Sequence, residues 1–125
     1  FEAAIEDLLR RSTPMSIVIV DVVGLKRVNE EQGFLAGDRV LEEAADRLRA
    51  ATATTPRPQG LYRLGGDELV ALYAGTEAGH RADQAVRMLT RADAGPSLRV
   101  GATAARPGDT RATLLDRLYA TARRS

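Results

Sequence analysis

Two groups of acidic residues stand out because each lies where an apolar segment ends. Asp21 closes a run of β-branched residues, and Asp67 and Glu68 follow Gly65-Gly66 between two apolar segments. A carboxylate at the end of a buried strand is costly without a partner, and carboxylates that converge repel one another unless a cation lies between them. Oxygen ligands with no His or Cys beside them favour Mg²⁺, which typically also binds substrate phosphates. We therefore expect a site for a divalent cation, Mg²⁺ or Mn²⁺.

Three polar residues beyond Asp21 have the types that a nucleotide site needs. Lys26 follows Asp21 closely in the sequence and can reach a phosphate. Asn29 lies one helical turn past Lys26 on the same side, and its amide both donates and accepts, as guanine recognition requires. Asp38 can accept from the guanine ring and amino hydrogens. Together with the acidic residues, these positions predict a nucleotide site.

A split βαβ arrangement is the expected scaffold for these residues. The centre of the element order is βαββαβ, an α/β (α+β) ferredoxin-like fold in which helices pack on one face of a mostly antiparallel sheet. The first strand and the hairpin are then neighbours, so their acidic ends can meet, and the other face of the sheet stays free for a ligand. Periodicity and turn residues predict helices at 1–11, 25–32 and 81–92, strands at 15–20 and 97–104, a hairpin over 61–73, a long helix opened by Gly37-Asp38, and a last helix after 107–109.

Composition limits the possible partners. The chain has 125 residues, enough for one domain over 1–125 and too few for two. It has no cysteine, which excludes disulfides, thiolate metal sites and a cysteine nucleophile. The formal net charge of +1 gives no basis for binding nucleic acid or a membrane surface, and no apolar stretch approaches a membrane span. With neither a signal peptide nor an initiator methionine, the chain is expected to be a cytoplasmic segment of a larger protein.

Two segments carry a resemblance to a known family. Residues 21–38, DVVGLKRVNEEQGFLAGD, resemble the GGDEF pattern D-x-D-x-F-K-x-x-N-D-x-x-G-H-x-x-G-D, and residues 63–69, RLGGDEL, resemble its R-x-G-G-D-E-F signature. Leu118-Tyr119 is similar to the closing helix of the family. Two long motifs in the right order make the chain resemble the diguanylate cyclases, which have a nucleotidyl-cyclase and polymerase-palm type of fold.

The resemblance implies a metal site built from four of these residues. Asp21 and Asp67 would be metal ligands, assisted by the backbone carbonyl of Val22. Glu68 would support the same site.

The resemblance also implies how the nucleotide would be held. Gly65 and Gly66 would let the turn lie close to the phosphates, and Lys26 would hold a phosphate. Asn29 and Asp38 would read the guanine.

The family's reaction takes place between two GTP-loaded domains that face each other head to head. The resemblance implies that each 3′-hydroxyl attacks the α-phosphate of the opposite GTP, giving cyclic di-GMP and pyrophosphate with the help of two metal ions. Asp67 would lie nearest the attacking hydroxyl. The expected partners are therefore GTP, a second copy of the chain and a flanking sensory or signalling domain.

Several family positions are changed in this chain. Val23 replaces the second carboxylate of D-x-D, Glu30 replaces an Asp and Phe34 replaces a His. Leu25 and Leu69 replace Phe and stay apolar. The closing helix of the family carries a phosphate-binding Lys three residues past its Tyr; that position is Ala122 here, and Arg123 or Arg124 is the available substitute unless the chain is truncated there.

Two family segments are missing. The family's inhibitory product site, R-x-x-D, would fall at Pro56 and Gln59, so we expect no product inhibition there. The motif D-x-L-T-G-L-x-N-R, which precedes the first helix in the family, is absent. The given sequence is therefore expected to begin after the start of the family domain.

Taken singly, these residues have simpler interpretations. Asp38 is a good helix N-cap, Asp67 and Glu68 are ordinary hairpin-turn residues, and Lys26 and Asn29 are ordinary surface residues. His80 is expected to be exposed in a polar loop, and the remaining aromatic side chains are expected to pack: Tyr62, Tyr73 and Tyr119. The alternative function is a non-catalytic GTP-binding module that regulates a neighbouring domain or partner.

Overall fold

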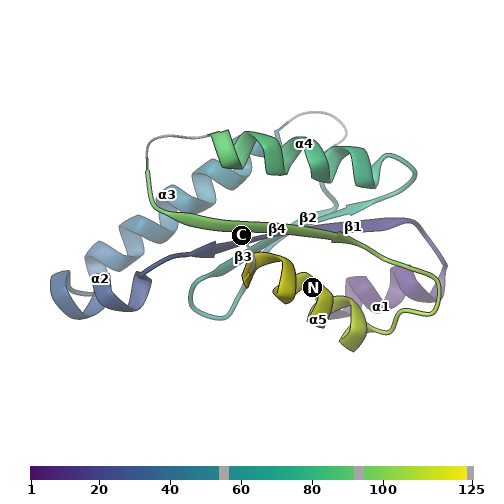
Figure 1. Cartoon of the computed structure of the whole chain (residues 1–125), viewed down its shortest axis with the longest axis horizontal. Coiled ribbons are helices and arrows are strands. Elements are labelled where there is room, and N and C mark those ends of the chain that lie inside the picture. Colours follow the sequence, from purple (N-terminus) through teal and green to yellow (C-terminus); the bar gives the residue numbers. More distant parts are fainter. Residues whose placement is uncertain (54–56, 92–94, 124–125) are drawn as a thin grey trace.

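Four strands and five helices make up the fold seen in the computed structural model, which describes residues 1–53, 57–91 and 95–123. Figure 1 shows the sheet between two layers of helices. The strands are β1 (Met15–Val22), β2 (Gly60–Leu64), β3 (Glu68–Ala74) and β4 (Leu98–Ala104). The helices are α1 (Glu2–Arg10), α2 (Leu25–Gln32), α3 (Phe34–Ala51), α4 (Ala78–Arg91) and α5 (Arg111–Arg123).

The strand order is β2-β3-β1-β4, and every neighbouring pair is antiparallel. This order confirms the expected split βαβ arrangement, in which β1 lies beside the second strand of the hairpin. Strand β1 is central and almost entirely buried because its β-branched side chains pack into the core on both faces of the sheet. The end of β1 is therefore held rigidly between β3 and β4.

Helices cover both faces of the sheet, so the expectation of one free face is wrong. One core cluster packs α3 and α4 against β1, β3 and β4, and a second packs α1 and α5 against the opposite face. In Figure 1, α3 and α4 lie above the strands and α1 and α5 below them. The alternating residues of β1 enter both clusters, since Val18 and Val20 belong to the first and Ile17 and Ile19 to the second. A ligand must therefore bind at the edge or end of the sheet.

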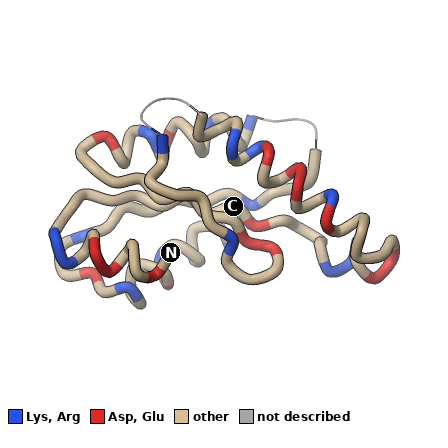
Figure 2. The backbone as a smooth tube through the Cα atoms, turned by 180° about the vertical axis from the view of Figure 1, so that it is seen from behind, with Lys and Arg blue, Asp and Glu red and all other residues tan. Residues whose placement is uncertain are grey.

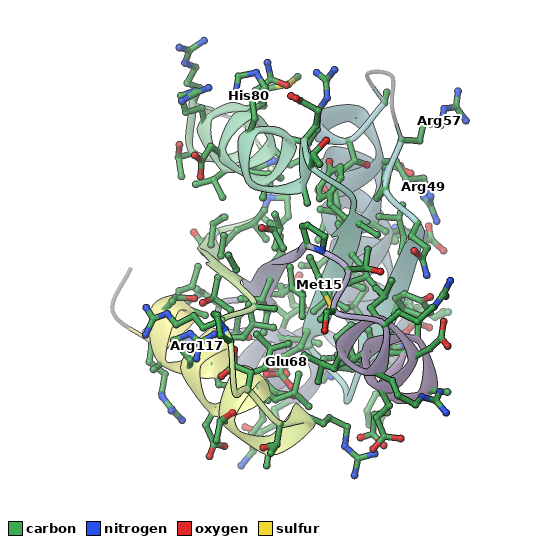
Figure 3. All side chains as sticks on the ribbon, turned by 90° about the vertical axis from the view of Figure 1, so that its right-hand side faces the viewer. Met15, Arg49, Arg57, Glu68, His80 and Arg117 are labelled. Carbon is green, nitrogen blue, oxygen red and sulfur yellow. The ribbon has the colours of Figure 1, made fainter. Side chains whose placement is uncertain are left out.

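Two predicted helix boundaries are wrong. Helix α3 begins at Phe34 rather than at Gly37-Asp38 because Gly33, with φ 91°, makes the turn between α2 and α3. Asp38 therefore lies inside the helix, and the N-cap interpretation of this residue is excluded. Helix α4 begins at Ala78, so His80 is exposed in its first turn instead of in a loop, on the outer side of the molecule in Figure 3.

Membrane insertion has no support in the helices. Within the described residues, none of them combines the length and the apolar character needed to cross a bilayer.

Candidate functional site

The end of β1 and the hairpin turn meet as the sequence predicts. Asp21 pairs with Glu68 in the β1–β3 register, and the backbone nitrogen of Val22 donates to the carbonyl oxygen of Asp67 at 2.9 Å. Figure 2 shows the acidic turn of the hairpin beside the acidic end of β1. Asp21 thus shares one end of the sheet with Asp67 and Glu68, which are far from it in the sequence.

The charges of these carboxylates act on one another. Burial and the nearby Asp67 carboxylate raise the pKa of Asp21, and the charge of Arg99 opposes this effect. Burial, Asp67 and Asp21 together raise the pKa of Glu68. Carboxylates that raise one another's pKa are held in a repulsive arrangement, which a divalent cation relieves.

Asp21 and Glu68 lie on the face of the sheet that α1 and α5 cover. Their neighbours along the strands, Val20 and Leu69, belong to the cluster on the opposite face, and side chains alternate along a strand. Figure 3 shows Glu68 in the space between α1 and α5. Glu68 also acts on α5, since burial and then the charge of Glu68 raise the pKa of Tyr119. Asp21 and Glu68 are therefore half-buried at the end of the sheet, on the side of α1 and α5.

The hairpin turn uses one of its two glycines for backbone shape. Gly65 has φ 64°, a left-handed conformation that costs other residues about 1 kcal/mol. Gly66 is not among the positive-φ residues, so only Gly65 of the pair needs the left-handed conformation. Arg63 donates to the Gly66 carbonyl oxygen at 2.7 Å and braces the turn. Gly66 is therefore free of a conformational demand, and a Cβ there would meet no atom within 4 Å.

Helix α2 starts directly after the acidic end of β1. Its N-cap is Gly24, with φ 76° and no side-chain capping bond, so no N-cap side chain satisfies the first backbone N–H groups of the helix. Such an end favours anions such as phosphate. Lys26 lies in this first turn with its side chain 91% exposed and only a 3.9 Å ion pair to Glu30. The predicted phosphate contact is therefore sterically open.

Helices α2 and α3 bring the two predicted guanine-binding residues into one corner. A Cβ added to Gly37 would lie 1.7 Å from the Oδ1 atom of Asn29, so the Asn29 side chain lies directly against the glycine. Asp38 is the next residue of α3 and is exposed. The two side chains therefore sit on adjoining helices, beyond the end of β1 that carries the carboxylates.

The donor set fits a hard divalent cation. Asp21 and Asp67 offer carboxylate oxygens, Val22 a nearby backbone carbonyl, and no His or Cys competes. No group of three His, Cys, Asp or Glu side chains gathers as a metal centre in the described part of the chain. Mg²⁺ usually takes one or two carboxylates and completes its shell with waters and phosphates, so two carboxylates suffice. Val23, where the family has a second carboxylate, is apolar and 42% exposed.

A cavity elsewhere on the molecule does not coincide with this site. About 310 Å³ of space lies between α3 and β2, lined by Leu41, Leu48, Leu61, Tyr62, Arg63 and Leu69 among others. It is largely apolar and contains none of the three carboxylates, so the chemistry of the acidic end and not the size of this cavity indicates the site.

The sequence did not indicate that two residues, Arg99 and Tyr119, lie near the carboxylates. Arg99 is the register partner of Asp21 in the β1–β4 pairing, and its alternation with Leu98 and Val100 was the available signal. Tyr119 was expected to pack, and it does so beside Glu68. Pro56 and Arg124 lie outside the described residues, and Gln59 is exposed ahead of β2.

Comparisons with known proteins identify the family of the chain. The sequence model of a family described as diguanylate cyclase, GGDEF domain, matches residues 1–115. MucR from Pseudomonas aeruginosa, a bifunctional diguanylate cyclase/cyclic di-GMP phosphodiesterase, is 33% identical over 72% of this chain and 13% of its own length. The diguanylate cyclase DgcS from Shewanella oneidensis is 30% identical over 53% of this chain and 21% of its own length.

A solved structure supports the fold. The GGDEF domain of DgcB from Caulobacter crescentus, in complex with c-di-GMP, has a TM-score of 0.75 over 99% of this chain and 78% of that chain. Its identity of 19% makes this a likeness of fold alone.

The matches cover most of this chain but only a small part of its curated relatives. The chain spans about a fifth or less of the two curated relatives, so what those whole proteins do is not carried over with the match. The family match ends at residue 115, so the likeness of Leu118-Tyr119 to the closing helix stays a prediction. With 115 of its 125 residues matched, the chain belongs to the GGDEF domain family.

Proposed function

We propose that the chain condenses two molecules of GTP into cyclic di-GMP and pyrophosphate. The observation that carries the proposal is the meeting of Asp21, Asp67 and Glu68 at one end of the sheet, next to the uncapped start of α2. Carboxylates able to hold a metal would then lie beside N–H groups able to bind a phosphate. Membership of a family whose curated members include diguanylate cyclases adds support.

The reaction would need two copies of the chain, each holding one GTP. The 3′-hydroxyl oxygen of one GTP bonds to the α-phosphorus of the other, the bond from that phosphorus to the pyrophosphate oxygen breaks, and the hydroxyl loses its proton. The same exchange on the second GTP closes the ring, so two pyrophosphates leave. A single copy offers one set of these groups, which makes a homodimer the expected active state.

The residues of this chain would mainly bind and orient. Asp21 and Asp67, with the Val22 carbonyl, would hold Mg²⁺ or Mn²⁺, and Glu68 would add negative charge at the same place. When bound, the metal would lower the pKa of the attacking hydroxyl and neutralise charge on the phosphates. Asp67, on the turn, would lie beside the 3′-hydroxyl. Most of the rate gain would come from this positioning and charge neutralisation.

The nucleotide would be held at two separate places. Lys26 and the first N–H groups of α2 would bind phosphate, while Asn29 and Asp38 would bind the guanine edge. Gly65 and Gly66 would let the turn approach the phosphates, since neither carries a side chain.

A second candidate function is a GTP-binding module without turnover that controls a neighbouring domain. Val23 favours it, because an exposed valine stands where a second carboxylate would strengthen the metal site. Phe34 also favours it, since this apolar side chain is 77% exposed where the family has a polar one.

Product formation tests the two candidates. Concentrated protein is incubated with GTP and Mg²⁺, and cyclic di-GMP is measured by mass spectrometry, alone and as a fusion that forces a dimer. The enzyme requires product that disappears in Asp67→Ala and persists in Asp46→Ala, an exposed carboxylate of α3 paired with Arg49. GTP binding with no product from the forced dimer would establish the regulatory module instead.

A further inference from the structure

Arg99 of β4 lies directly across from Asp21. The two residues are partners in the antiparallel β1–β4 register. Residues that face each other across an antiparallel pair project from the same face of the sheet. The Arg99 guanidinium is therefore on the face that carries Asp21 and Glu68, and it is the nearest cation on a neighbouring strand.

The guanidinium of Arg99 is not engaged elsewhere. Its side chain is exposed, and it makes no hydrogen bond and no ion pair within 4.0 Å to any described residue. Other arginines near the sheet are occupied: Arg117 is held by Asp109 and Arg63 by the Gly66 carbonyl. Arg99 is thus close enough to Asp21 for their charges to interact, yet its five donors remain available.

The described part of helix α5 packs against β4 two residues away from Arg99. Gly101 is the next residue on the same face of β4, and a Cβ there would lie 2.1 Å from the Thr121 Oγ1 atom and 2.7 Å from the Ala122 backbone nitrogen. The helix is therefore pressed directly onto the strand at Gly101. Arg99 is the next position on this face of β4, and it is exposed at the same end of the sheet as the carboxylates.

We propose that Arg99 binds the terminal phosphates of the nucleotide triphosphate whose metal is held by Asp21 and Asp67, an assignment that rests on the proposed function. A metal between the carboxylates would neutralise their charge, so the positive charge of Arg99 would act on an anion instead of on Asp21. The fork of an arginine matches two phosphate oxygens at once, whereas a lysine offers a point charge. With Lys26 in the first turn of α2, the phosphates would have a second cation from another element.

A simpler role for Arg99 is to balance the acidic end of the sheet in the free protein. In that case its loss would lower stability and leave phosphate binding unchanged. Binding of a phosphate chain without a base separates these roles, because it measures the phosphate contact alone.

The test uses isothermal titration calorimetry with inorganic tripolyphosphate and Mg²⁺. Arg99→Ala should weaken Mg²⁺-tripolyphosphate binding about tenfold, the loss of one bidentate charge-assisted contact, and Arg99→Lys should recover part of it. Arg49→Ala is the matched control, since Arg49 is an exposed arginine paired with Asp46 on α3, and it should bind as the wild type does. Arg99→Gln, which keeps length and polarity, replaces the alanine variant if that variant does not fold.

The outcomes decide the assignment separately from the proposed function. Equal binding of Mg²⁺-tripolyphosphate by wild type and the Arg99 variants, or no binding by the wild type, would overturn the role of Arg99. The proposed function is tested in a parallel titration with GTP and ATP. Arg99-dependent tripolyphosphate binding with no preference for GTP would contradict the guanine site and leave the phosphate contact standing.

Discussion

The side chain of Asn29 fills the space that a Cβ on Gly37 would need, with its Oδ1 atom 1.7 Å from that position. The contact joins α2 to α3 and fixes where the Asn29 amide lies relative to Asp38. Gly37 therefore allows Asn29 to approach α3 closely. Its backbone conformation does not require glycine, since it lies inside a regular helix.

Gly37→Ala should displace the Asn29 side chain and weaken GTP binding about tenfold or more, because a hydrogen-bonded site that loses its partners is left with unpaired polar groups. In an open helix the same change would stabilise the protein by about 1 kcal/mol. Here the clash should cancel that gain. Calorimetric GTP titration and thermal unfolding measure the two effects.

The double variant supplies the control for this prediction. In an Asn29→Ala background the clash is gone, so Gly37→Ala should become stabilising and should cost no further GTP affinity. Additive losses in the double variant would mean that Gly37 acts independently of Asn29.

The two glycines of the hairpin turn should respond differently to alanine. Gly65→Ala should lower stability by about 1 kcal/mol, because φ 64° is unfavourable for a residue with a Cβ. Gly66→Ala should leave the free protein unchanged in urea unfolding, since its Cβ meets nothing within 4 Å. If the turn lies close to phosphates, Gly66→Ala should still weaken Mg²⁺-GTP binding. Unchanged affinity in Gly66→Ala would place the phosphates away from the turn.

Sequence patterns predicted the parts of the fold that depend on local chemistry. The β-branched run of β1 and the Gly65-Gly66 turn are short-range signals, and both elements form as expected. The pairing of β1 with the hairpin then follows from the split βαβ order, which is why the meeting of Asp21 with Glu68 could be predicted without a structure.

Features that depend on packing between distant segments could not be read in the same way. Gly37 resembles a helix start in sequence, but α3 begins at Phe34, and inside this helix Gly37 packs against Asn29. The second helical layer arises because α5 returns beneath β4, against Gly101. Arg99 reaches the site through a register with Asp21 that no local pattern specifies.

The acidic end of the sheet should reduce the stability of the metal-free protein. Folding raises the pKa of Asp21 above 3.8 and of Glu68 above 4.5. The folded state then binds protons more tightly than the unfolded chain, so the contribution of these groups to the free energy of unfolding falls as pH rises above those values. Asp21→Asn should therefore raise the melting temperature at neutral pH, by about 2 °C for partly exposed groups.

Mg²⁺ should reverse the order of the two melting temperatures, so that the wild type melts above Asp21→Asn. Ligands that bind only the folded state stabilise it, so saturating Mg²⁺ should raise the melting temperature of the wild type and leave that of Asp21→Asn nearly unchanged. A wild type insensitive to Mg²⁺, or an Asp21→Asn protein that melts lower than the wild type without metal, would argue against a shared metal site.

The Asp109–Arg117 pair should stabilise the fold without taking part in the site. The Arg117 Nη2 atom lies 2.6 Å from Asp109 Oδ2, and Arg117 also donates to Thr103 Oγ1 at 2.9 Å and to the Ala104 carbonyl at 2.7 Å. The two side chains are only 19% and 7% exposed, so the pair ties α5 to the end of β4 from a largely buried position. Arg117→Ala should lower the free energy of unfolding by about 2–3 kcal/mol, because it leaves the largely buried Asp109 carboxylate without its charged partner.

The pH dependence of unfolding separates this pair from the acidic site. Hydrogen bonds from Arg117 hold the pKa of Asp109 well below its ordinary 3.8, so the stability it contributes is present above that value and is lost as pH falls below it. Asp109→Asn should therefore make the free energy of unfolding, measured in urea, depend less on pH below 3.8. Asp21→Asn should change this pH dependence in the opposite direction. Mg²⁺-GTP affinity at neutral pH should stay within about twofold of the wild type, since additive behaviour is expected for separated sites. A large loss of affinity in a folded Asp109→Asn protein would show that α5 positions the nucleotide site through this pair.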